Sequence, residues 1–174
     1  MNYWEKRYFE CSKTCQIDKW WYANEKDATQ NAIRSFMADY KPESVLDFGC
    51  GIGNNVDLFD CQYVGYDIVD EMIEDNIVKY HDKYFTSSLS DALARVYDLV
   101  MFVGVIQHIP DGELTKTIDA VKTRCKDILI LEISQESNEY IFHRPDLAAQ
   151  LVSENKLKLH KSYMSDIRLL WMKP

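Results

Sequence analysis

The sequence predicts an α/β fold: a single-domain, doubly wound, seven-stranded sheet that is mostly parallel with one antiparallel strand. Apolar, β-branched segments alternate with amphipathic segments along the chain, which is typical of a parallel sheet covered by helices on both faces. Near the carboxyl terminus, two strand-like segments, 157–163 and 167–172, are separated by only a few polar residues. Because so short a connection cannot cross over a sheet, these two strands must be antiparallel.

The separate elements follow from local patterns. Asp27 to Gln30 resembles a capping box, and Ile33, Phe36 and Tyr40 follow at helical spacing, which predicts a helix over about 27–40. Later apolar runs lack strict alternation and therefore indicate strands buried on both faces. We expect strands near 44–48, 62–67, 84–88, 97–103 and 127–133, and helices near 53–59, 70–80, 88–95, 112–124 and 145–155.

Length and composition limit the organisation of the chain. A sequence of 174 residues with 47% hydrophobic and 13% aromatic residues predicts one domain over residues 1–174. Residues 1–24 are rich in aromatic side chains, which must pack on something. Two interpretations remain open: this segment covers the core, or residues 1–40 form an aromatic and helical lid over a cleft.

Charge and cysteine content exclude several classes of protein. The net charge of −8 and the absence of a basic run favour a small-molecule partner and make nucleic acid unlikely as a substrate. No segment has eighteen consecutive apolar residues, so we expect no membrane contact and a cytoplasmic protein, monomeric or homodimeric. Five cysteines are widely spread, and Cys11 and Cys15 lack a second pair, so we expect reduced thiols and no metal.

A glycine-rich segment after the first strand is the strongest functional signal. Gly49, Gly51 and Gly53 follow the apolar run 45–48 at every second position, which permits a sharp turn and close approach of the backbone to a ligand. Asp67 ends the next strand, where a carboxylate can accept two hydrogen bonds from ribose hydroxyls. The pattern predicts a pocket for a nucleoside cofactor.

The spacing of the glycines distinguishes between cofactors. Position 54 is Asn54, so the dinucleotide pattern is absent and the segment reads Asp-x-Gly-x-Gly-x-Gly from Asp47. This segment resembles motif I of the class I S-adenosylmethionine (SAM) dependent methyltransferases, and Asp67 resembles the acid of their motif II. The resemblance implies a Rossmann-like methyltransferase fold that binds SAM, with Asp47 near the ammonium group. The cofactor contacts that it implies are Asp47, Gly49, Cys50, Gly51, Gly53, Asn54, Asp67, Ile68, Ser87, Ser88, Leu89, Val103 and Gly104.

The adenine end of the expected site departs from the family pattern. Many relatives carry an aspartate after the third strand, but this chain has no acid there until Asp91. Ser87, Ser88 or the backbone of Leu89 could bind the adenine amino group instead. Ile68 has two open interpretations, an apolar contact with adenine or an ordinary core residue.

The fourth strand and its exit, 97–110, resemble motif IV of the methyltransferases that act on small molecules. The tip of this strand, at Val103 and Gly104, should face the methyl donor. The segment lacks the Asn-Pro-Pro-Tyr or Asp-Pro-Pro-Tyr sequence with which DNA amino-methylating enzymes hold a flipped base, so DNA base methylation is disfavoured.

His108 is the candidate catalytic residue, because an imidazole can accept a proton near neutral pH. It could instead brace the turn before Pro110 or line the pocket. Candidate acceptor contacts lie in the aromatic amino-terminal segment, at the end of the fifth strand and in the loop that follows it. These contacts are Trp21, Glu132, Tyr140, His143 and Arg144.

The resemblance implies a SAM-dependent methyltransferase that transfers a methyl group to oxygen or nitrogen of a small or medium-sized acceptor. A short NAD-dependent oxidoreductase is disfavoured by Asn54 and by the absence of a Tyr-x-x-x-Lys pair after the fourth strand. The alternative is a SAM-binding sensor, or a non-catalytic partner subunit that keeps the fold and the cofactor site.

Overall fold

The computed structural model describes residues 3–13, 26–133, 146–164 and 167–173. Its centre is one seven-stranded sheet with the strand order β3-β2-β1-β4-β5-β7-β6. The strands are β1 (Ser44–Phe48), β2 (Gln62–Tyr66), β3 (Tyr84–Thr86), β4 (Tyr97–Val103), β5 (Cys125–Ile133), β6 (Lys158–Met164) and β7 (Ile167–Lys173). β7 pairs antiparallel with both neighbours, and all other pairs are parallel. The predicted sheet and its antiparallel carboxyl-terminal pair are confirmed.

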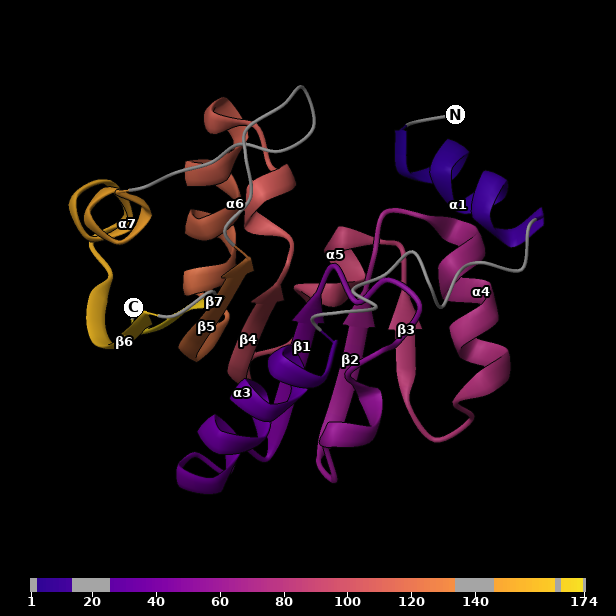
Figure 1. The fold of residues 1–174 in the computed structure, drawn as a ribbon, viewed down its shortest axis with the longest axis horizontal. Helices are drawn as coiled ribbons and strands as arrows, with labels where there is room; N and C mark the ends of the chain where they lie inside the picture. The colour runs from indigo at the N-terminus through magenta and orange to yellow at the C-terminus, as the bar shows by residue number, and fades with distance from the viewer. Residues whose placement is uncertain (1–2, 14–25, 134–145, 165–166, 174) are drawn as a thin grey trace.

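Helices cover both faces of the sheet (Figure 1). They are α1 (Tyr3–Lys13), α3 (Lys26–Asp39), α4 (Asp70–Lys79), α5 (Leu89–Ala92), α6 (Asp111–Lys122) and α7 (Leu147–Asn155). α5, α6 and α7 pack on one face, and α3 and α4 pack on the other. The sheet is therefore doubly wound, as predicted. Within the described residues, no helix is both long and apolar enough to cross a membrane.

The side chains of β4 show why this sequence forms a central strand. Leu99 and Met101 pack toward α3 and α4, whereas Val100 and Phe102 pack toward α6 and α7, and all four are fully buried. Burying each such side chain contributes about 1.5–3 kcal/mol. A strand with two apolar faces is stable only between two layers of helices, and this places β4 at the centre of the sheet.

The helix expected over 53–59 is wrong. Residues 51–55 form turns, and only a single 3-10 turn, η1 (Val56–Leu58), follows them. Gly53 has a φ of +77°, which no α-helix accommodates, and Gln62 already begins β2. Too few residues remain between these points for a longer helix. Elsewhere the predicted bounds shift by a few residues, most of all for α5, which has four residues where eight were expected.

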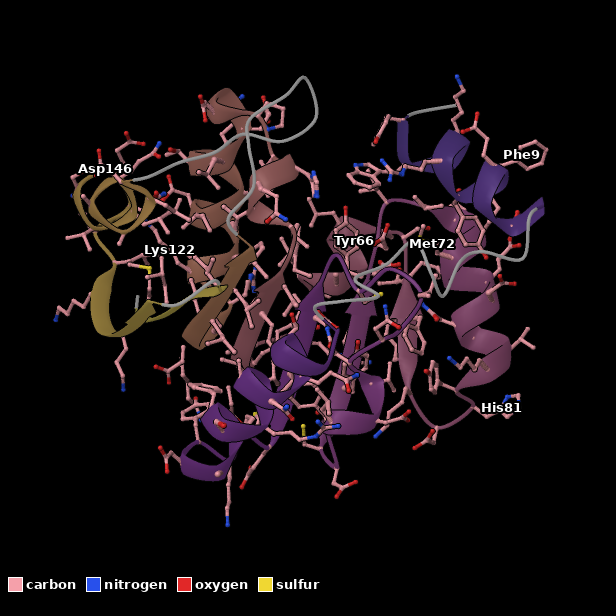
Figure 2. The ribbon with its side chains drawn as sticks, viewed as in Figure 1. Phe9, Tyr66, Met72, His81, Lys122 and Asp146 are labelled. Atoms are coloured by element: carbon pink, nitrogen blue, oxygen red, sulfur yellow. The ribbon has the colours of Figure 1, made fainter. Side chains whose placement is uncertain are left out.

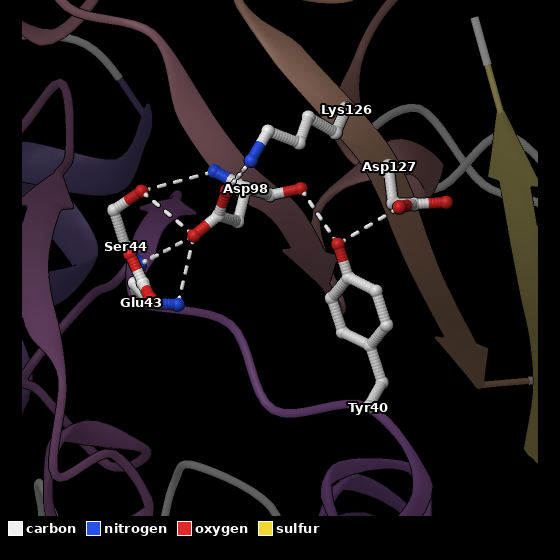
Figure 3. Close-up of polar contacts among 6 residues, drawn as sticks. All are labelled: Tyr40, Glu43, Ser44, Asp98, Lys126 and Asp127. Atoms are coloured by element: carbon white, nitrogen blue, oxygen red, sulfur yellow. Dashed lines mark hydrogen bonds and ion pairs between the residues drawn. The ribbon is translucent and has the colours of Figure 1, made fainter.

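A polar network connects the elements at the end of the sheet where its parallel strands begin (Figure 3). The Asp98 carboxylate accepts hydrogen bonds from the backbone N–H groups of Glu43 (2.8 Å) and Ser44 (3.1 Å). Its bond with Lys126 lowers the pKa of Asp98 below its usual range. The Tyr40 hydroxyl, just after α3, lies 2.8 Å from Oδ2 of the buried Asp127. The network therefore joins the end of α3 to the starts of β1, β4 and β5.

At the opposite end of the sheet, where the parallel strands finish, α1 lies above the start of α4, on the side of the molecule where β3 is the outer strand (Figure 1). Tyr8 packs with Val69 and Met72, and its hydroxyl donates a hydrogen bond to Asp75 of α4. Burial and this carboxylate raise the pKa of Tyr8. α1 therefore covers the carboxyl ends of the strands, which is where doubly wound folds bind their ligands.

Candidate functional site

A cavity of about 150 Å³ lies beneath α1, at the carboxyl ends of β1, β2 and β4. Most of its wall is apolar, and Figure 2 shows two of the lining side chains, Tyr66 and Met72, below α1. Phe9 of α1 points away from it and is half exposed. The lining residues are Trp4, Phe48, Gly49, Tyr66, Asp67, Ile68, Val69, Met72, Val103, Gly104, Val105, His108 and Ile109.

The Asp67 carboxylate is the charged group of the cavity wall, and backbone donors hold it in place. Its Oδ2 accepts a hydrogen bond from the N–H of Gly51 (2.9 Å), and its Oδ1 accepts one from the N–H of Val69 (3.1 Å). Each oxygen keeps a lone pair for a second donor. Burial raises the pKa of Asp67, although these backbone donors act against the rise. This arrangement fits a pair of ribose hydroxyls.

Side chains of α3 and of the α4 region hold the carbonyl groups of the glycine loop, residues 49–55. The buried Asn76 donates to the carbonyl of Gly51 (2.6 Å), and the Tyr80 hydroxyl donates to that of Gly53 (3.1 Å). A Cβ atom at Gly53 would lie 2.7 Å from the Tyr80 ring, so only glycine fits there. Gln30 donates to the carbonyl of Asn54 (2.8 Å). The loop is thus fixed before any ligand binds.

Asp47 lies beneath the loop and is fully buried. Its Oδ2 accepts a hydrogen bond from the Tyr63 hydroxyl (2.7 Å), whereas Oδ1 has no partner among the described residues. Burial raises the pKa of Asp47 to about 6, and the side chains of Tyr63 and Asn55 limit the rise. A buried carboxylate oxygen without a donor is costly, so it fits a cationic ligand group such as an ammonium.

The exit of β4 forms the other wall. Val103 and Gly104 line the cavity, and Gly104 has a φ of +68°, which turns the chain away from the strand. His108 follows in the 3-10 turn η2 (Ile106–His108). Its ring contacts the ring of Trp4 edge to face, with centroids 4.5 Å apart. The imidazole therefore lies between the strand tip and α1.

Several of the residues expected at the cofactor lie together. Gly49, Asp67, Ile68, Val103, Gly104 and His108 line one cavity. Ile68 is 51% exposed, so it is not a core residue and its apolar surface is open to a ligand. Cys50 and Gly51 are buried in the loop behind this wall, where burial raises the pKa of the Cys50 thiol.

Other predicted contacts are not brought to the cavity wall. Ser87, Ser88 and Leu89 do not line it, and Ser88 accepts a hydrogen bond from the N–H of Asp91 as the N-cap of α5. Gly53 and Asn54 line a second cavity, on α3 and η1. Glu132 lies in β5 opposite Arg168 of β7. Trp21, Tyr140, His143 and Arg144 lie outside the described residues.

The sequence did not identify three residues that support the site through their contacts, namely Trp4, Asn76 and Tyr63. Trp4 belonged to the aromatic segment, but nothing singled it out from its neighbours. Asn76 did leave a signal, because it is a polar residue on the apolar face that Met72 and Ile73 give to α4. Tyr63 left none, since a tyrosine within an apolar strand is an ordinary core residue.

Comparison with known proteins decides the family. Residues 20–169 match a family model described as a methyltransferase domain. The chain belongs to this methyltransferase family. The match spans the sheet, the glycine loop and the exit of β4, so it includes most of the cavity described above. No curated protein sequence matches this methyltransferase significantly.

Solved structures show the same fold. Magnesium protoporphyrin IX methyltransferase (ChlM) from Synechocystis, with bound S-adenosylhomocysteine (SAH), has a TM-score of 0.77 at 14% identity and covers 98% of this chain and 96% of its own. A SAM-dependent methyltransferase from Clostridium acetobutylicum has a TM-score of 0.70 at 11% identity, with 99% of both chains covered. The 16S rRNA methylase ArmA has a TM-score of 0.68 at 18% identity, with 97% of both covered. The resemblance to class I SAM-dependent methyltransferases is confirmed in family and fold.

Proposed function

We propose that this methyltransferase transfers the methyl group of SAM to an oxygen or nitrogen atom of a small or medium-sized acceptor. One observation carries the proposal: a single apolar cavity at the carboxyl ends of β1, β2 and β4 combines Gly49, Asp67, Gly104 and His108. Gly49 and Asp67 are suited to bind a nucleoside cofactor. Gly104 and His108 lie where the methyl group would be transferred.

Two residues of the cavity wall, Asp67 and Ile68, fit the cofactor, and so does Asp47, which is buried and does not itself line the cavity. Asp67 would accept hydrogen bonds from the ribose hydroxyls, and the exposed face of Ile68 would contact adenine. The Asp47 Oδ1 atom, which lacks a donor among the described residues, would pair with the ammonium group. The bound cofactor supplies an electrophilic methyl group on a positively charged sulfur. The similar fold of ChlM, whose structures contain SAM or SAH, supports this assignment.

The protein contributes alignment and removal of a proton. Holding the acceptor in line with the methyl group can be worth about 7–11 kcal/mol, and the apolar wall excludes water. When a hydroxyl acceptor takes the methyl group and SAH leaves, the imidazole of His108 would accept the proton that the acceptor oxygen loses. Trp4 restricts the position of that imidazole through the contact between their rings.

Two features favour a small acceptor over RNA. The net charge of −8 repels a polyanion, and the cavity wall is mostly apolar. The likeness to ArmA shows that this fold also serves an rRNA methylase, so RNA belongs among the acceptors tested. Trp21, Glu132, Tyr140, His143 and Arg144 remain proposed acceptor contacts.

The lid of the proposed single domain is α1 rather than the whole of residues 1–40, because α3 packs on a face of the sheet. Trp4 of α1 lines the cavity, and Tyr8 packs beside it on Val69 and Met72. The cavity is partly open, and its volume of about 150 Å³ is smaller than the roughly 300–1,000 Å³ of a typical ligand pocket. α1 should therefore move outward when a nucleoside cofactor enters.

The test is release of SAH from SAM in the presence of separate panels of hydroxyl, amine and RNA acceptors. We expect turnover with a small hydroxyl or amine compound. With a hydroxyl acceptor, His108→Ala should lower kcat about 10²–10⁴-fold and change SAH affinity little. His81→Ala is the matched control, because His81 is exposed and lies away from the cavity. Its kcat should equal that of the wild type.

Other outcomes would overturn parts of the proposal. Tight SAH binding without turnover on any panel would favour the alternative, a SAM-binding sensor or non-catalytic subunit. Turnover on RNA alone would contradict the small acceptor. Full activity of His108→Ala would assign His108 a structural part.

A further inference from the structure

A second cavity, of about 430 Å³, lies on the opposite side of the glycine loop from α1's contacts, between α3, η1 and the end of α4. It shares no lining residue with the cofactor cavity, and its wall is mostly polar. The lining residues are Gln30, Arg34, Gly53, Asn54, Asp57, Leu58, Lys79 and Tyr80. Gly53 and Asn54 belong to the glycine loop, and Gln30 and Tyr80 hold it, whereas Arg34, Asp57 and Lys79 have no part in the reaction proposed above.

Two cations from different helices face this cavity. Among the described residues, Arg34 of α3 donates hydrogen bonds to two neutral amide oxygens, those of Asn31 (3.1 Å) and Gln30 (3.3 Å). Lys79 of α4 lies over the Tyr80 ring at 4.7 Å. Within the described part of the chain, neither cation forms an ion pair. Asp57 is the only carboxylate among the lining residues, so two cations face one anion in this cavity, and in a chain with a net charge of −8 this excess favours an anionic ligand.

Each cation contacts a side chain that holds the glycine loop. Arg34 bonds to Gln30, whose amide donates to the carbonyl of Asn54. Lys79 contacts Tyr80, whose hydroxyl donates to the carbonyl of Gly53. A ligand that draws the two cations together would therefore shift Gln30 and Tyr80, and with them the hydrogen bonds to the carbonyl groups of Asn54 and Gly53.

We propose that this cavity binds a phosphate group, free or as a small phosphomonoester, through Arg34 and Lys79, and that its occupancy alters cofactor affinity through the glycine loop. A guanidinium binds two phosphate oxygens with paired N–H groups, and an ammonium adds a point charge. The volume leaves room for the organic part of an ester. The effect on the cofactor rests on the proposed function, whereas the anion site does not.

The anion site is tested by calorimetric titration of the full chain, without SAH, with inorganic phosphate and separately with glycerol 3-phosphate. Chloride holds the ionic strength constant, so screening is equal in all samples. We expect one site per chain. Tighter binding of the ester points to a phosphorylated metabolite, and equal binding points to free phosphate. No saturable binding of either probe would overturn the site.

Variants identify the residues. The double variant Arg34→Gln with Lys79→Gln should weaken phosphate binding at least about tenfold. Arg95→Gln with Lys116→Gln is the matched control, with the same change of charge at exposed positions outside the cavity, and should bind as the wild type does. Asp57→Asn removes a carboxylate from the cavity wall and should tighten binding. An equal loss in both double variants would overturn the assignment.

The coupling is tested by titrating SAH with and without saturating phosphate. The SAH dissociation constant should change, and SAH should change the phosphate dissociation constant by the same factor, because coupling between two sites is reciprocal. Independent affinities would overturn the coupling. Absence of SAH uptake would overturn the proposed function and the coupling together, while the phosphate titration would still decide the anion site.

Discussion

The Asp67 carboxylate lines the cavity, while the loop and the residue before α4 hold both of its oxygens. If ribose binds there as proposed, Asp67→Ala removes two charge-assisted hydrogen bonds. At about 1.5–3 kcal/mol each, their loss should weaken SAH binding about 10²–10⁴-fold, measured by calorimetry. Asp60→Ala, at an exposed aspartate before β2, is the control. Unchanged affinity in Asp67→Ala would refute this placement of the ribose.

Asp47 predicts how cofactor affinity depends on pH. Its pKa of about 6 means that the carboxylate, which would pair with the ammonium group, is lost as the pH falls. SAH affinity should therefore drop between pH 7 and pH 5, approaching about tenfold per unit below pH 6. The raised pKa of Asp67 acts in the same direction. Asp47→Asn should leave only the contribution of Asp67.

The contribution of Asp47 to the stability of the free protein should depend on pH in the opposite direction to its contribution to SAH affinity. The folded state binds a proton at Asp47 more tightly than the unfolded chain does, whose pKa is near 3.8. The contribution of Asp47 to the free energy of unfolding therefore increases as the pH falls from about 6 to 4. Urea titrations of wild type and Asp47→Asn measure it. If SAH affinity changes with pH equally in the wild type and in Asp47→Asn, Asp47 does not pair with the ammonium group of the cofactor.

At the scale of elements, α4 supports the glycine loop. Asn76→Leu leaves the buried carbonyl of Gly51 without its donor, which should cost about 1–3 kcal/mol of stability and raise the SAH dissociation constant about tenfold. Ile73→Val, on the same buried face, should lower stability by about 0.5–1.5 kcal/mol and leave SAH affinity unchanged. Equal affinities of Asn76→Leu and the wild type would show that α4 does not position the loop.

α3 is joined to the end of the sheet where the parallel strands begin, away from the cofactor cavity. A substitution there should therefore lower the stability of the protein without changing its affinity for SAH. Tyr40→Phe removes the hydroxyl that donates to the buried Asp127 and to the Asp98 carbonyl (3.0 Å). Unfolding in urea should reveal a loss of about 1–3 kcal/mol, with SAH affinity unchanged. Tyr84→Phe, at an exposed tyrosine, should cost far less. A large fall in SAH affinity in Tyr40→Phe would mean that the two ends of the sheet are coupled.

For the whole molecule, the sequence predicted those parts that depend on local pattern. Apolar runs such as 99–103 determine buried strands wherever they occur, and the short connection between 164 and 167 allows only an antiparallel pair. The helix over 53–59 is wrong because the glycine spacing, from which a binding loop is predicted, also prevents a helix at Gly53.

The positions of candidate residues could be predicted where they lie near a strand tip. Asp67, Gly104 and His108 line one cavity, as expected, and their roles at the cofactor and the acceptor stay predictions. The contacts of Trp4 with His108 and of Tyr63 with Asp47 join distant segments, and no local pattern encodes them. The second cavity likewise depends on packing of α3 beside the end of α4, which only the folded chain reveals.

SAM should bind at the carboxyl ends of β1, β2 and β4, and a crystal structure of the complex with SAH is the decisive experiment. We expect the ribose hydroxyls on the Asp67 carboxylate, the sulfur beside Gly104, and α1 displaced so that Trp4 no longer contacts His108. SAH bound elsewhere, or ribose hydroxyls without contact to Asp67, would show that the cofactor is misplaced.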